Sequence, residues 1–161
     1  MPGVKQRDLP PEKMMCAALL QLSVASEVLV FQISNADRVP EALREFLGDE
    51  SIRFCGTAIG NDVSMLLYYN ISIPGAFDLQ NLWNLTGNLT PSLVDLSNYY
   101  IGTNLQKKKK GDRSRNKGWS DVLDIERIRY AAMDARVGFE FARKYLHLAG
   151  YNSPKDHLNV V

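Results

Sequence analysis

Short apolar runs separated by polar turns dominate the start of the chain. Ala17–Val24 and Val28–Ser34 are two such runs, with Gln21 and Gln32 as isolated polar residues and Ser26-Glu27 between the runs. Runs of this length around a tight turn are typical of paired strands. The pattern predicts that the fold begins with a β-hairpin.

Segments with a helical apolar period then alternate with further short apolar runs. Val39–Leu47 has a helical apolar period, and Ile52–Ile59 has the composition of a strand. Residues 62, 65, 66 and 69 fall on one helix face, for which Asn61 is the expected N-cap. Ala76–Leu79 is the last short run before residue 90 and predicts another strand. This order of elements indicates helices layered on a sheet.

The second half of the chain is predominantly helical. Ser92–Tyr100 and Asp124–Leu148 are both expected to form helices, the second with Asp124 as N-cap. The sequence therefore predicts an α/β or α+β layered domain with a mixed sheet. We assign this domain to residues 17–148. Residues 1–16 are expected to be a poorly ordered extension, and residues 149–161 a tail that is loose after Pro154.

Composition narrows the class of protein. The 161 residues are 45% apolar and 23% charged, which suits one folded domain and excludes a disordered chain. No apolar run is long enough for a transmembrane helix, and the polar N-terminal segment is unlike a secretory signal. Cys16 and Cys55 have no metal-binding or disulfide spacing and are expected to be buried free thiols. These features predict an intracellular protein, nuclear or cytoplasmic, without membrane contact.

The charges are segregated along the chain. The overall net charge is +1, but residues 106–118 carry +6 and the rest of the chain carries −5. A concentrated basic loop is typical of a phosphate-backbone contact, although a solvated loop or a nuclear-import signal has the same composition. The candidate nucleic-acid-binding residues are Lys107, Lys108, Lys109, Lys110, Arg113, Arg115, Lys117 and the adjacent Trp119.

Three side chains could carry chemistry. Asp62 follows the predicted strand Ile52–Ile59, where an acid either complements the helix dipole or serves as a metal ligand facing the sheet. Tyr130 and Asp134 are four residues apart and therefore share one helix face. Trp119 could stack on a base, and it could equally anchor the end of the basic loop in the core.

Three segments resemble one nuclease family. FCGTAIGNDVSMLLYYNISIPGAFDLQNLW is similar to the second motif of Werner-type 3′–5′ exonuclease domains, and IRYAAMDARVGFEFARKYL is similar to their third motif. ALLQLSVASEVLVFQI resembles the second and third strands of the same ribonuclease H-like fold. The third motif has the form found in the tyrosine subtype of the four-carboxylate (DEDD) exonucleases. The resemblance covers Ala17 to Leu146.

The resemblance implies phosphodiester hydrolysis by two Mg²⁺ or Mn²⁺ ions. Asp62 would be the carboxylate of the second motif, Asp134 a metal ligand from the third motif, and Tyr130 the phenol that helps to position a water molecule. The basic loop would lie near the entrance and hold the nucleic-acid strand, as positive residues do in the family.

The first motif of this family, Asp-x-Glu on the central strand, is missing. Asp8 and Glu12 are four residues apart around two prolines, which does not suit a strand. We therefore expect a catalytically impaired module that binds nucleic acid or protein. The alternatives are an active exonuclease completed by acids from elsewhere or from a partner chain, and a fragment of a longer protein. The missing strand would leave the edges of Leu19–Val24 and Phe54–Ala58 unpaired, which predicts a homo-oligomer or a protein partner there.

Overall fold

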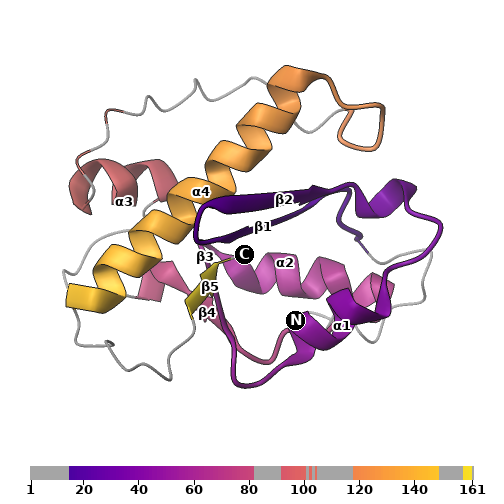
Figure 1. The fold of residues 1–161 in the computed structure, drawn as a ribbon, viewed down its shortest axis with the longest axis horizontal. Helices are drawn as coiled ribbons and strands as arrows, with labels where there is room; N and C mark the ends of the chain where they lie inside the picture. The colour runs from indigo at the N-terminus through magenta and orange to yellow at the C-terminus, as the bar shows by residue number, and fades with distance from the viewer. Residues whose placement is uncertain are drawn as a thin grey trace, which may run out of the picture.

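A five-stranded mixed sheet forms the centre of the molecule (Figure 1). The computed structural model describes residues 15–81, 92–100, 102, 104, 118–148 and 158–160. The strand order is β2-β1-β5-β3-β4; β1 is antiparallel to β2 and β5, whereas β3 is parallel to β4 and β5. The mixed sheet predicted from the sequence is confirmed. The strands are β1 (Leu20–Val24), β2 (Glu27–Phe31), β3 (Arg53–Gly56), β4 (Ala76–Asp78) and β5 (Leu158–Val160).

The first two strands form the predicted hairpin, with a turn one residue earlier than expected. Val24 pairs with Glu27, so the turn is Ala25-Ser26. Ala25 has a φ of +52°, as the tight hairpin turns require at this position. The second strand ends at Phe31 and not at Ser34, because the chain enters a 3₁₀ turn, η3 (Ile33–Asn35).

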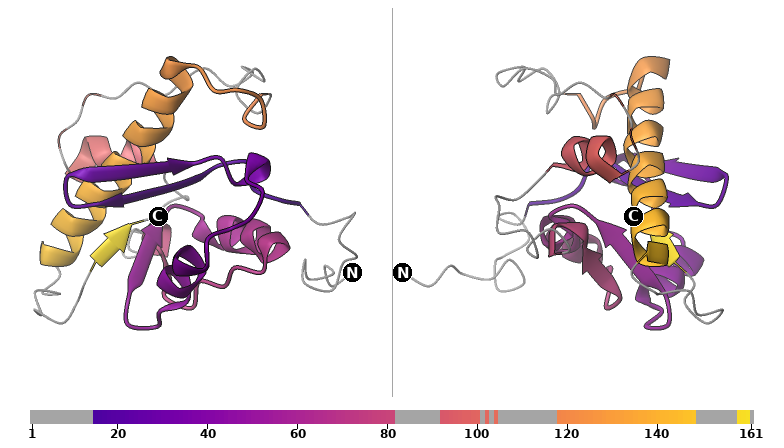
Figure 2. Two further views of the ribbon diagram at one scale, coloured as in Figure 1. Left: turned by 45° about the vertical axis from the view of Figure 1, so that its right-hand side comes forward. Right: turned by 90° about the vertical axis from the view of Figure 1, so that its left-hand side faces the viewer.

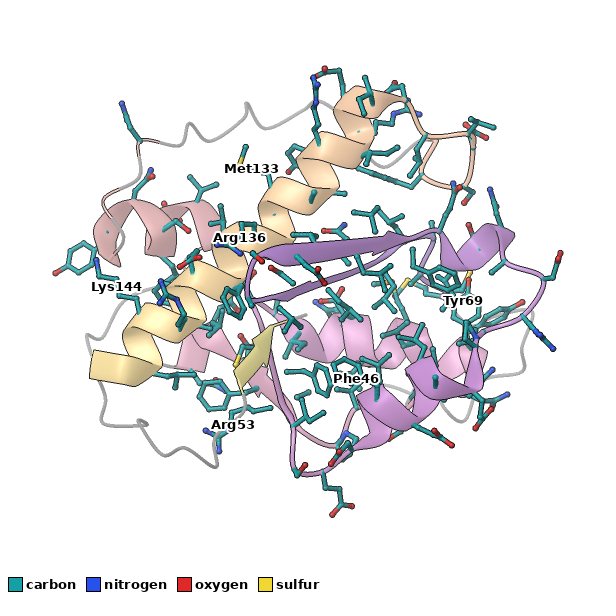
Figure 3. All side chains as sticks on the ribbon, in the orientation of Figure 1. Phe46, Arg53, Tyr69, Met133, Arg136 and Lys144 are labelled. Carbon is teal, nitrogen blue, oxygen red and sulfur yellow. The ribbon has the colours of Figure 1, made fainter. Side chains whose placement is uncertain are left out.

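Helices α1 (Glu41–Gly48) and α2 (Ile59–Leu66) cover one face of the sheet, and α2 continues into the 3₁₀ turn η4 (Leu67–Tyr69). Side chains alternate between the faces of a strand, so Leu20 and Leu22 of β1 point into this layer. Phe46 of α1 meets Phe54 of β3 edge to face, with ring centroids 5.4 Å apart (Figure 3). This cluster is the larger of the two cores.

Helices α3 (Leu93–Tyr100) and α4 (Ile125–Leu148) cover the opposite face. Buried Cys55 packs there with residues of both helices, among them Leu96 and Phe141. Both views in Figure 2 show α4 crossing the end of the β1–β2 hairpin. The predicted thiol burial is confirmed for Cys55 and wrong for Cys16, which is exposed because it precedes β1 at the edge of the fold.

Two contacts fix α4 relative to the sheet. Asp124 caps the helix, because its Oδ1 accepts a hydrogen bond from the Arg127 N–H at 2.8 Å, so the predicted N-cap is confirmed. Further along, Arg136 donates a hydrogen bond to the carbonyl oxygen of Ala25 and forms an ion pair with Glu140 at 2.6 Å (Figure 3). The helix is therefore attached to the hairpin turn.

Strand β5 lies between β1 and β3. Ser23 of β1 pairs with Val160, and residues 53–55 of β3 pair with residues 158–160. The prediction of a loose tail after Pro154 is wrong for residues 158–160, since β3 and β1 both offer them backbone partners. For the same reason, the expectation of wholly unpaired edges on Leu19–Val24 and Phe54–Ala58 is wrong at Ser23, Phe54 and Cys55.

Within the part of the chain that the structure describes, no helix is long and apolar enough to cross a membrane.

Candidate active site

Asp62 owes its position to an abrupt turn between β3 and α2. The N-cap of α2 is Ala58, whose φ of +55° lies in the left-handed region, and Asn61 is inside the helix. The prediction of Asn61 as N-cap is therefore wrong, because the helix begins at Ile59. Asp78 of β4 braces this turn: its Oδ1 accepts hydrogen bonds from the N–H groups of Ala58 at 3.1 Å and Gln80 at 2.9 Å. Asp62 thus falls in the first turn of α2.

Tyr130 and Asp134 project from the middle of α4. Between them, Ala131 is fully buried, and one turn further Gly138 is buried as well. Small residues at these positions let the helix approach the sheet closely. The phenol and the carboxylate thereby reach the same region as the first turn of α2.

A cavity of about 350 Å³ brings the three side chains together. Asp62, Tyr130 and Asp134 all line it, beside Gln21 of β1 and Thr57 after β3. The structure therefore places the sequence-predicted carboxylates and phenol in one site, although their catalytic roles stay predictions. Gln21 was not predicted as a site residue. Its signal was visible in the sequence, where it is a lone polar residue within an apolar strand.

Trp119 lines a second cavity of about 570 Å³, which shares Asp62 and Gln21 with the first. Its ring centroid is 6.4 Å from that of Tyr130. The Gln32 side-chain amide donates hydrogen bonds to the carbonyl oxygens of Trp119 at 2.7 Å and Asp121 at 2.6 Å. The indole is therefore held beside the candidate site by its backbone, and its ring borders open space. This position accommodates both roles predicted for it.

The basic residues of the predicted nucleic-acid loop lie outside the described residues, so the structure does not place them. The end of that segment is described: Gly118 lines the larger cavity, and the Asn35 side chain donates a hydrogen bond to the Ser120 carbonyl oxygen at 2.8 Å. The segment with the +6 charge therefore ends at the rim of the candidate site.

The electrostatics of the site centre on Asp62. Burial of its carboxyl group against the cavity walls, and secondarily the negative charge of Asp78, raise its pKa to about 6. The residue is nevertheless exposed on its outer side, so water screens part of this effect. The pKa of Asp62 therefore lies above the usual value of a carboxyl group.

The described residues do not fit a two-metal centre. Among them, no group of three or more His, Cys, Asp or Glu side chains is arranged to hold a metal ion. Asp62 and Asp134 supply two carboxylates, whereas a pair of divalent cations needs several preset oxygen ligands. Among the residues that the structure describes, the site thus offers fewer carboxylates than a pair of divalent cations needs.

The domain is a mixed sheet with helices on both faces, and acidic side chains from α2 and α4 line one cavity. A family model described as 3′-5′ exonuclease matches residues 11–147. The chain belongs to the 3′–5′ exonuclease family. The family and the fold class predicted from the sequence are confirmed.

Two curated relatives are each 28% identical to the chain. One is exonuclease 3′-5′ domain-containing protein 2 of Drosophila melanogaster, matched over 79% of this chain and 22% of the relative. The other is the putative 3′-5′ exonuclease R431 of Acanthamoeba polyphaga mimivirus, matched over 84% of this chain and 35% of the relative. The chain thus spans about a fifth and a third of their lengths. A crystal structure of the EXD2 exonuclease domain soaked in Mn and GMP is 26% identical, with 84% of this chain and 70% of that chain covered and a TM-score of 0.39.

Proposed function

We propose that the chain is a 3′–5′ exonuclease-like module that binds a nucleic-acid strand and hydrolyses it slowly or not at all. The observation that supports this function is the 350 Å³ cavity, where Asp62, Tyr130 and Asp134 meet without a third metal-binding carboxylate among the described residues. Family membership supports nucleic acid as the substrate class, and the small number of carboxylates among the described site residues supports the impairment.

The charge distribution supports nucleic acid as the bound partner. A segment with a net charge of +6 ends at Gly118, on the rim of the cavity that Trp119 and Asp62 line. Lysine and arginine side chains near phosphates release condensed counterions, which favours binding at low salt. Trp119 offers an aromatic surface at the end of this segment, on which an unpaired base could stack.

The metal requirement of the module follows from its ligands. Asp62 and Asp134 would hold at most one Mg²⁺ or Mn²⁺, weakly, because a lone Mg²⁺ retains most of its water unless several oxygens are preset around it. Tyr130 would then act on the strand or pack against Trp119, and it would have no firmly held water to orient.

The decisive experiment compares the intact chain with Asp134→Ala on 3′-labelled oligonucleotides in Mn²⁺. We expect negligible digestion by both proteins, while fluorescence anisotropy shows that both bind the single strand. Digestion from the 3′ end that is lost in Asp134→Ala would contradict the impairment. It would favour the alternative, an active exonuclease whose missing carboxylates come from elsewhere or from a partner chain.

A further inference from the structure

Gln32 is an isolated polar residue directly after the apolar strand β2. Its side-chain amide crosses to the segment before α4, where it donates hydrogen bonds to the carbonyl oxygens of Trp119 at 2.7 Å and Asp121 at 2.6 Å. An amide nitrogen carries two N–H donors, so both are used on one short segment. We call this segment, residues 118–121, the 118–121 turn.

Asn35 adds a third hydrogen bond to the same turn. Its side-chain nitrogen donates to the Ser120 carbonyl oxygen at 2.8 Å. The Ser34 hydroxyl donates to the Asn35 side-chain oxygen at 3.2 Å, which orients the amide so that its nitrogen faces the turn. The carbonyl oxygens of three consecutive residues therefore accept hydrogen bonds from two side chains of the segment that follows β2.

These two amides are mounted on a packed element. Gln32 and Asn35 flank the 3₁₀ turn η3, whose Ile33 is 2% exposed within the larger core. The Ser34 N–H donates to the Ala18 carbonyl oxygen at 3.2 Å, so η3 is also tied to the chain before β1. Side chains on a rigid support hold their partners more precisely than side chains on a loop.

Helix α4 holds the 118–121 turn from its other side. The Arg127 guanidinium donates to the Gly118 carbonyl oxygen at 3.2 Å, and the Asp121 N–H donates to the same oxygen at 3.3 Å. Gly118 has a φ of +89°, and a Cβ atom there would lie 2.9 Å from the Arg127 guanidinium. Glycine suits this position for both reasons. The turn is thus fixed both by the segment after β2 and by α4.

The fixed turn sets the place of the Trp119 ring. Gly118, Trp119 and Ser120 all line the larger cavity, and the Trp119 ring centroid is 6.4 Å from that of Tyr130, which lines the smaller one. A side chain that is ordered only when a ligand binds lowers the affinity, whereas one already in place does not. An aromatic surface held in this way is therefore prepared to stack on an unpaired base.

We infer that Gln32 and Asn35 are positioning residues for nucleic-acid binding. Their amides hold the 118–121 turn so that Trp119 presents its ring at the larger cavity before a single strand arrives. The two residues act through Trp119 and do not themselves contact the strand. This inference rests on the proposed function for the identity of the ligand.

A double-mutant cycle tests the inference. Gln32→Met keeps a side chain of similar length, removes both donors and changes no charge. We expect it to weaken binding of a single-stranded oligonucleotide about fivefold, as the loss of neutral hydrogen bonds allows. The slope of log K against log salt should stay the same, because no phosphate contact is lost. In a Trp119→Ala background, Gln32→Met should weaken binding by less than about twofold, since residues that act through one another are not additive.

Acrylamide quenching of Trp119 fluorescence tests the positioning in the free protein. Trp83→Phe leaves one indole in the chain and serves as the background. Gln32→Met should increase the quenching and lower the fluorescence anisotropy of Trp119. Asn35→Ala removes one of the three hydrogen bonds, so we expect the same changes with a smaller amplitude. It also keeps the test available if Gln32→Met fails to fold.

Ser97→Ala is the matched control. It removes a buried hydroxyl that donates to the Leu93 carbonyl oxygen within α3 at 2.8 Å, and it leaves the 118–121 turn intact. We expect a loss of stability without a change in quenching or in oligonucleotide affinity.

The outcomes separate the inference from the proposed function. Binding by the wild type that Gln32→Met and Asn35→Ala leave unchanged would overturn the inference alone, as would unchanged quenching or additive effects in the cycle. A wild type that binds no oligonucleotide would overturn the proposed function and this inference with it.

Discussion

At the scale of single residues, the site is organised around the turn that precedes Asp62. The left-handed Ala58 and the carboxylate of Asp78 that braces it set the direction in which α2 leaves β3. Asp62 then projects into a cavity already bordered by Asp134. Burial, and secondarily the negative charge of Asp78, raise the pKa of Asp62 in this position.

The raised pKa of Asp62 predicts a pH-dependent stability. Its value is about 6 in the folded chain and near 3.8 in the unfolded chain, so the folded state binds more protons between these values and loses stability as pH rises through them. Asp62→Asn should therefore unfold with the same free energy as the wild type below pH 4. At pH 7 we expect the variant to be more stable by about 1 kcal/mol, after allowance for screening by water.

Urea unfolding of both proteins at several pH values measures this difference. A gap between them that is constant from pH 4 to pH 7 would contradict the assignment of the pH dependence to Asp62. Asp37→Asn, a change at an exposed carboxylate outside the site, is the matched control.

The brace at Asp78 gives a second prediction at this scale. Asp78→Asn keeps an oxygen that can accept the hydrogen bonds from Ala58 and Gln80 and removes the negative charge. The pKa of Asp62 should fall, but remain above its usual value because burial is the larger cause. Carboxyl carbon NMR titration of Asp62 checks both statements. An unchanged pKa in Asp78→Asn would show that the charge of Asp78 has no influence on the site.

At the scale of elements, the sequence predicted most of what the structure shows. Apolar periodicity placed the hairpin, α1, β3, α2, β4, α3 and α4 in the right order, because each buries a continuous apolar face. The convergence of Asp62, Tyr130 and Asp134 followed from the resemblance to the family. Element ends were less accurate: Ala58 has no sequence signal for a left-handed conformation, and this conformation moved the start of α2 from the expected Asn61 cap.

Strand β5 could not be predicted from local pattern. Its three residues are too few to show an alternation, and they form a strand because β1 and β3 present backbone groups to them. Tertiary pairing thus determined this element, as is common for short strands.

The join between β3 and β4 predicts a strong effect of one methyl group. Gly75 precedes β4, and its carbonyl oxygen accepts a hydrogen bond from the Phe54 N–H at 2.9 Å. A Cβ atom at Gly75 would lie 1.9 Å from the backbone oxygen of Ile52, so the backbone would have to shift. Gly75→Ala should destabilise the fold by about 3 kcal/mol, at the upper end of overpacking costs.

Gly48 provides the matched control for this substitution, because a Cβ atom there meets nothing within 4 Å. Thermal unfolding should show Gly48→Ala within about 1 kcal/mol of the wild type. Equal stabilities of the two alanine variants would mean that β3 and β4 are not packed as closely as the structure describes.

At the scale of the whole molecule, charge is separated between an acidic body and one basic segment. This separation predicts salt-sensitive binding of single-stranded oligonucleotides. Replacing Lys107 to Lys110 by glutamine should weaken binding at low salt and reduce the slope of log K against log salt by up to about 3, at roughly 0.7 per lost contact with a single strand.

Anisotropy titrations from 50 mM to 200 mM salt, a range over which phosphate contacts lose much of their affinity, measure these slopes. Substitution of Lys144, an exposed lysine on α4 distant in sequence from the basic segment, serves as the control. A slope unchanged by the four glutamines would assign the segment to solubility or nuclear import.

The position of β5 also affects how the molecule can be assembled. The β1–β2 hairpin and the β3–β4 pair are joined across the described sheet by β5, which follows the other four described strands in the sequence. During translation, the two halves of the sheet emerge long before the segment that links them. Contacts between such distant segments slow folding, since a long loop has to close before they form. The nascent chain would therefore expose its β1 and β3 edges until residues 158–160 arrive, and in this interval chaperones could bind these edges.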